Sequence, residues 1–111
     1  MRLDRERLRD ILEAIEAIER YTSAGREEFD RNELVRVWCL HYIEIIGEAT
    51  ANLSEDARVR APNIPWRNVI GMRNILVHAY FQVDWQEIWN VVERDLAPLK
   101  LGIRELLAYF E

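Results

Sequence analysis

The chain has 111 residues, of which 50% are hydrophobic and 32% are charged, and its formal net charge at pH 7 is −5. This length suits one domain, residues 1–111, with a single core. The composition excludes a disordered chain, and no apolar run reaches the roughly 18 residues of a membrane span. Cys39 is the only cysteine, so an internal disulfide is excluded. With no signal-peptide core near the N-terminus, these features predict a cytoplasmic protein.

Helical periodicity begins near the N-terminus. Apolar residues recur there at three- and four-residue spacing, at Leu8, Ile11, Leu12, Ile15 and Ile18. They predict a one-sided surface helix that ends near Gly25. Asp30 and Glu33 have the spacing of a capping box, which predicts a second helix running to about Leu53. Residues 34–46 are apolar nearly all round, so this helix is expected to be central or to be covered on its second face by another subunit.

Proline and asparagine then interrupt the helical pattern. Residues 54–64 are polar or basic and are expected to form a loop, and Pro65 suits the first turn of a third helix over 66–78. Asp84, three residues before a glutamate, repeats the capping-box pattern. Apolar residues then recur at helical spacing as far as the C-terminus, which predicts a fourth helix. Pro98 is expected to kink or split this last helix. The predicted fold class is therefore all-α, an up-and-down bundle of four to five helices.

Charge is distributed unevenly along the chain. Residues 57–83 contain four arginines and no acidic residue, giving +4, while the remaining residues sum to −9. An acidic body with one basic segment still offers a local anion site. Arg58, Arg60 and Arg67 are candidate phosphate contacts, and a solvated loop face is the alternative interpretation of these side chains.

Four polar side chains interrupt an otherwise apolar segment near the end of the third helix: Arg73, Asn74, His78 and Tyr80. A helical wheel places Arg73 within the apolar stripe of this helix. A guanidinium on an apolar face is costly unless it has a partner or a function. The segment supplies a cation, an amide, an imidazole and a phenol within about two turns, and it is the candidate functional site.

The residue types present exclude several kinds of catalytic site. The chain has two histidines, and no carboxylate pair brackets either of them at metal-ligand spacing, so no metal site is predicted. A nucleophile elbow and a glycine-rich phosphate loop are also missing, and no cofactor is predicted. Metal-free acid–base work on an RNA phosphodiester remains. His78 would take a proton from a ribose 2′-hydroxyl or protonate the leaving oxygen, and Arg73 would stabilise the charge on phosphorus.

The same residues carry a family resemblance. Arg73, His78 and Tyr80 match the Arg-x4-His-x-Tyr signature of HepT-like toxins in the HEPN superfamily, and Asn74 matches the polar residue that follows the arginine. The chain resembles that family over roughly residues 3–108. The flanking words that also match are Ile46-Gly47-Glu48-Ala49, Pro65-Trp66, Gly71-Met72 and Val83-Asp84.

The resemblance implies a helical-bundle homodimer in which two signature segments face a shared cleft. It implies a toxin of a toxin–antitoxin pair that acts as a metal-independent endoribonuclease. The implied partner is a minimal nucleotidyltransferase (MNT) antitoxin, which in some pairs transfers AMP from ATP to the signature tyrosine, here Tyr80. Such a group would place bulk and negative charge beside Arg73 and block a phosphate site.

Structural and non-catalytic interpretations stay open. Arg73 could pair with Glu44 or Glu48 of the second helix, and Asn74 could orient His78 or cap a backbone group. The chain could also be a non-catalytic partner that docks a nucleotidyltransferase and presents a tyrosine or a substrate to it.

Two further residue types have a mainly structural interpretation. His41 is expected to be a core or interface histidine, because it lies on the apolar second helix. The tryptophans at the starts of the third and fourth helices are expected to belong to the core, with base stacking as the lesser alternative: Trp66, Trp85 and Trp89.

Overall fold

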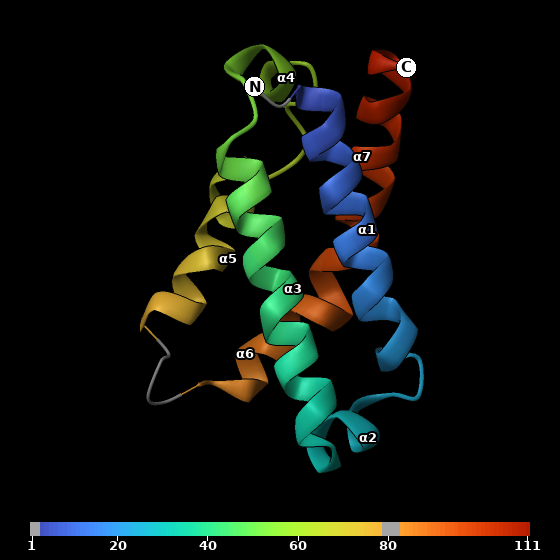
Figure 1. The fold of residues 1–111 in the computed structure, drawn as a ribbon, viewed down its shortest axis with the longest axis vertical. Helices are drawn as coiled ribbons and strands as arrows, with labels where there is room; N and C mark the ends of the chain where they lie inside the picture. The colour runs from blue at the N-terminus through green and yellow to red at the C-terminus, as the bar shows by residue number, and fades with distance from the viewer. Residues whose placement is uncertain (1–2, 79–82) are drawn as a thin grey trace.

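The computed structural model describes residues 3–78 and 83–111, with side chains described for 3–74 and 83–111. All regular structure within these residues is helical. Four long helices alternate in direction (Figure 1): α1 (Asp4–Thr22), α3 (Glu33–Ala51), α5 (Trp66–His78) and α7 (Leu96–Phe110). Shorter elements join them: α2 (Arg26–Arg31), α4 (Glu55–Val59), α6 (Trp85–Asn90) and the π-helical segment η1 (Val91–Asp95). The all-α class is confirmed, and the expected number of helices was too low because short helices were missed.

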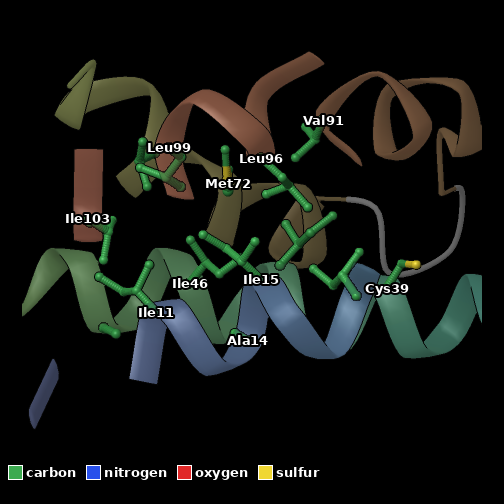
Figure 2. Close-up of a cluster of buried hydrophobic side chains, with 14 of the residues drawn as sticks. Ile11, Ala14, Ile15, Cys39, Ile46, Met72, Val91, Leu96, Leu99 and Ile103 are labelled. Atoms are coloured by element: carbon green, nitrogen blue, oxygen red, sulfur yellow. The ribbon is translucent and has the colours of Figure 1, made fainter. Parts of the chain in front are cut away.

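The core lies around α3, which packs against α1 on one side and against α5 on the other. Helix α1 in turn packs against α7. Figure 2 shows side chains from these helices gathered in the core, among them Ile15, Ile46, Met72 and Leu99. The expectation that the second long helix is central is therefore confirmed.

The predicted start of that helix was wrong by two residues. Its N-cap is Asn32, whose side chain accepts hydrogen bonds from the backbone N–H groups of Leu34 at 3.0 Å and Val35 at 3.4 Å. Asp30 instead lies inside the short helix α2. Asn32 takes the capping role because its backbone is extended, at φ −112° and ψ 100°, which aims its side chain at the first free N–H groups.

The segment 54–64 was expected to be a loop, yet it contains α4. The hydroxyl oxygen of Ser54 accepts a hydrogen bond from the N–H of Ala57 at 3.1 Å and so caps this helix. Ser54 also donates to the Asp4 carboxylate, through its backbone N–H at 2.9 Å and its hydroxyl at 2.6 Å. A contact between residues 50 positions apart therefore supports a one-turn helix that no local apolar period announces.

The last helix is divided, but not at the proline. The Asp84 side chain caps α6 by accepting from the Glu87 N–H at 3.2 Å, as predicted. The interruption is η1, and Pro98 follows as the third residue of α7. Because proline has no N–H, it could not donate to the carbonyl of Arg94 in a continuous helix. The wider π turn around Arg94 lies directly before this missing hydrogen bond.

The tryptophan prediction is confirmed. Trp89 is buried, and Trp66 and Trp85 pack against the core while partly exposed. The expected core position of His41 was wrong, because its side chain is exposed and its ring lies 5.0 Å from that of Tyr42. The inward face of α3 is occupied instead by residues on the other side of the helix, among them Cys39, Ile43 and Ile46. An interface role for the histidine stays a prediction.

Candidate functional site

The helix that carries the candidate site begins where the sequence predicts. The Val69 N–H donates to the carbonyl of Pro65 at 3.0 Å and closes the first turn of α5. The indole N–H of Trp66 donates to the carbonyls of Arg58 at 2.9 Å and Ala61 at 3.0 Å. These bonds attach the start of α5 to α4 and to the segment that follows it, so the direction of α5 is set at its N-terminus.

Arg73 lies where α5 crosses α3. A Cβ added to Gly47 of α3 would lie 2.6 Å from the Arg73 backbone nitrogen and 2.9 Å from its Cβ. Any side chain at position 47 would therefore collide with α5, and glycine is what allows the two backbones to approach so closely. The crossing fixes the point from which the arginine side chain starts, and it confirms that Arg73 belongs to the face of α5 that meets the bundle.

The guanidinium at this crossing reaches an acidic side chain of α3. Nη1 of Arg73 lies 3.5 Å from Oε2 of Glu48, and 42% of the arginine side chain and 63% of the glutamate side chain are exposed. The structural alternative of an ion pair with the second long helix is thus confirmed for Glu48 and not for Glu44. An exposed pair of this kind contributes only about 0–1 kcal/mol. The side chain keeps access to solvent and to an anion.

Glu48 is itself held in place by a residue that sequence reasoning did not single out. The Asn52 side-chain amide, at the C-cap of α3, donates to the Glu48 backbone carbonyl at 2.9 Å and to Oε1 of its carboxylate at 3.3 Å. The carboxylate therefore has one oxygen on Asn52 and the other towards Arg73. The signal available in the sequence was the four-residue spacing of Glu48 and Asn52 on a predicted helix.

The other signature residues lie at or beyond the end of α5. Asn74 is exposed, directly after the arginine. His78 is the last residue of α5, and its side chain lies outside the described part of the structure. Tyr80 also falls outside the described residues. The roles assigned to these three side chains stay predictions.

The three arginines predicted to contact phosphate do not gather at Arg73. The Arg60 guanidinium lies over the Tyr109 ring, 4.1 Å from its centroid. Arg67 is exposed and lines a cavity of about 600 Å³ between α5 and the η1–α7 region, which Arg73 does not line. Arg58 contributes its carbonyl to the tryptophan contact at the start of α5. Arg60 therefore lies on an aromatic ring and Arg67 beside a cavity, both away from Arg73. The use of the three arginines as phosphate contacts stays a prediction.

Other candidate chemistries find little support in the residues described. No three histidine, cysteine or acidic side chains in this part of the chain are placed to hold a metal ion. Cys39 is fully buried, and burial raises the pKa of its thiol to about 12, so it is not a nucleophile at neutral pH. Within the same ranges, no helix has the length and apolar character to cross a membrane.

Comparison with known proteins decides the family. The family model described as "Ribonuclease HepT-like" matches residues 11–106. The chain belongs to the HepT-like ribonuclease family. This confirms the family that the Arg-x4-His-x-Tyr signature predicts.

Individual relatives agree over most of their length. The "Probable ribonuclease HepT" of Thermococcus cleftensis is 40% identical over 100 residues, covering 89% of this chain and 91% of that protein. The "Putative RNase MJ1380" of Methanocaldococcus jannaschii is 37% identical over 94 residues, covering 84% and 86%. The "Putative RNase TTE0752" of Caldanaerobacter subterraneus is 32% identical over 108 residues, covering 96% of each chain. No solved structure matches the chain significantly.

Proposed function

We propose that this HepT-like protein is the toxin of a toxin–antitoxin pair and a metal-independent endoribonuclease, with Arg73 and His78 as its catalytic residues. The observation that carries the proposal is the placement of Arg73. Its guanidinium is partly exposed, and it starts from a helix crossing that Gly47 makes unusually tight. A cation held at a fixed point with access to solvent suits a phosphate that gains charge during reaction.

The proposed reaction uses the nucleophile that RNA already contains. A ribose 2′-oxygen attacks the adjacent phosphorus, its proton passes to a base, and the bond from phosphorus to the 5′-oxygen breaks as that oxygen receives a proton. His78 carries one of these proton transfers, and Arg73 stabilises the negative charge on the phosphoryl oxygens. The expected products are a 2′,3′-cyclic phosphate and a free 5′-hydroxyl. Asn74 is proposed to support the imidazole.

We further propose that two copies share one cleft. Leu34, His41 and Glu48 are spaced by seven residues, so they lie along one face of α3, and all three are exposed. Leu34 is 80% exposed, and Val37 beside it is 49% exposed. These exposed apolar side chains favour a second copy at the Leu34 end of this face. Glu48, at the other end, would lie at the edge of the contact and stay open to the cleft. Burial of the Leu34 end would bring the two arginines towards a common site.

The antitoxin part of the proposal concerns Tyr80. An MNT-type nucleotidyltransferase would transfer AMP from ATP to the tyrosine oxygen and release pyrophosphate. The added phosphate would occupy the anion site of Arg73, and its negative charge would repel the RNA backbone. Modification would then neutralise the ribonuclease without unfolding it.

Cleavage by purified, unmodified protein in the presence of EDTA tests the proposal. The wild type should cut a single-stranded RNA and leave cyclic phosphate ends, and an RNA with 2′-deoxyriboses throughout should stay intact. Arg73→Ala and His78→Ala should abolish cleavage, while sedimentation still shows a dimer. Requirement for a divalent cation would refute the metal-free mechanism.

The alternative function, a non-catalytic subunit that presents Tyr80 to a nucleotidyltransferase, makes the opposite prediction. The wild type would leave RNA intact and would still accept AMP from its partner enzyme in the presence of ATP. RNA cleavage by the unmodified protein distinguishes the two functions, because it is expected only of the ribonuclease. Mass spectrometry of Tyr80→Phe after the reaction with ATP tests the modification site in either case, since this variant lacks the phenol oxygen that would accept AMP.

A further inference from the structure

We infer that Glu48, held by Asn52, is a positioning residue for Arg73, an inference that rests on the ribonuclease function proposed above. The three side chains form a chain from the C-cap of α3 to the candidate site. The Asn52 amide lies 3.3 Å from one carboxylate oxygen, and the Arg73 guanidinium lies 3.5 Å from the other. Glu48 would act through the arginine and would not touch the RNA.

The geometry leaves the arginine available for a phosphate. A guanidinium has five N–H donors, and its ion pair with Glu48 is made from Nη1, at 3.5 Å. The remaining donors can face an anion on the exposed side. A free arginine side chain loses about 2 kcal/mol of rotamer entropy when it is immobilised. A carboxylate that already limits its rotamers lets the guanidinium meet the transition state with less reorganisation.

The backbone supports the same conclusion. The tight contact of Gly47 with Arg73 fixes the distance between α3 and α5 at the residue next to Glu48. Both ends of the ion pair therefore start from fixed positions, although both side chains are exposed. Exposed ion pairs stabilise proteins little, so fold stability does not explain the pairing of Glu48 with Arg73. Orientation of the arginine side chain explains it better.

A positioning carboxylate has a distinctive kinetic consequence. Its negative charge lies near the phosphate site and opposes ground-state binding of RNA. Its removal should therefore leave RNA affinity unchanged or stronger while the chemical step becomes slower. A merely structural residue would lower both together, through a loss of folded protein.

Glu48→Gln tests the inference, with Glu44→Gln as the matched control. Glu44 is exposed one turn earlier on α3 and does not pair with Arg73. Single-turnover cleavage by Glu48→Gln should be slower by about tenfold or more, with a melting temperature like that of the wild type. Binding of an uncleavable 2′-O-methyl RNA should be as tight as in the wild type or tighter. Glu44→Gln should cleave at the wild-type rate, and Asn52→Ala should slow cleavage by a smaller factor than Glu48→Gln.

The results separate the inference from the function on which it rests. If the wild type cleaves RNA and Glu48→Gln cleaves equally fast, the positioning role is wrong and the proposed function stands. A parallel loss of cleavage, 2′-O-methyl RNA binding and thermal stability in Glu48→Gln would show a structural role and would also overturn the inference. A wild type that cleaves no RNA would overturn both.

Discussion

Replacement of Gly47 by alanine tests the helix crossing on which the candidate site depends. The added Cβ would lie 2.6 Å from the backbone nitrogen, 2.9 Å from the Cβ and 3.2 Å from the Cα of Arg73. Unbonded heavy atoms are comfortable at about 3.5–4.0 Å, so α5 must move away by roughly 1 Å. Two of the three opposing atoms belong to the backbone, and no change of rotamer relieves the collision.

The size of the effect follows from two opposing contributions. Overpacking of this kind costs about 1–3 kcal/mol, and alanine is favoured over glycine inside a helix by about 1 kcal/mol. Gly71 of α5 supplies the matched control, because a Cβ there meets no described atom within 4 Å. Gly71→Ala should therefore stabilise the protein by up to about 1 kcal/mol, and Gly47→Ala should be less stable than Gly71→Ala by about 1–3 kcal/mol.

Urea unfolding and thermal melting of both variants measure this difference. A gap of 1 kcal/mol corresponds to roughly 4–8 °C in melting temperature for a chain of about this size. The displaced arginine should also slow RNA cleavage in Gly47→Ala, by up to about 100-fold for a shift of 1 Å. Equal stabilisation by the two alanines would show that α3 and α5 do not approach closely at Arg73.

Two further predictions concern local features of the fold. Cys39 should resist a disulfide reagent at pH 8 until the protein unfolds, because burial raises the pKa of its thiol from 9 to about 12. The folded protein then holds this proton more tightly than the unfolded chain, so the contribution of Cys39 to stability is complete below pH 9 and falls as the pH rises from 9 towards 12. Asn32→Ala should lose about 1 kcal/mol of unfolding free energy, while Asp30→Ala should stay within about 0.5 kcal/mol of the wild type.

Each of these has a clear contrary outcome. Rapid modification of Cys39 in the folded protein would show that the thiol reaches solvent. A larger loss of unfolding free energy in Asp30→Ala than in Asn32→Ala, measured in urea under the same conditions, would show that Asp30 is the N-cap, as the sequence pattern suggests.

The long helices are predictable from the sequence because their signals are local. The boundaries of α5 were predicted correctly, since a proline precedes its first residue and apolar spacing continues through it. The cap of α6 at Asp84 was predicted for the same reason. The start of α3 was misplaced because Asp30 and Asn32 are both good capping residues, and only the extended backbone at Asn32 distinguishes them.

The short elements depend on distant contacts. Helix α4 has five residues, too few to be stable alone, and it is supported by the Asp4 carboxylate on Ser54. The break before α7 lies in η1, ahead of Pro98, so the proline predicts that the last helix is divided but not the residues at which it divides. His41 was misplaced because an apolar helix surrounded on two sides still has a third face in solvent.

The all-α class, the order of the long helices and the family can be predicted without coordinates, because the period of apolar residues and a fixed spacing of polar residues are properties of the chain. Which acidic residue meets Arg73 depends on how the helices pack. From the sequence, Glu44 and Glu48 are equally plausible partners for Arg73. Arg73 pairs with Glu48 because of the position at which α3 and α5 cross. Gly47 sets that crossing, because the absence of a side chain lets the backbones of α3 and α5 come close together. A local sequence pattern does not specify which two helices meet at a glycine.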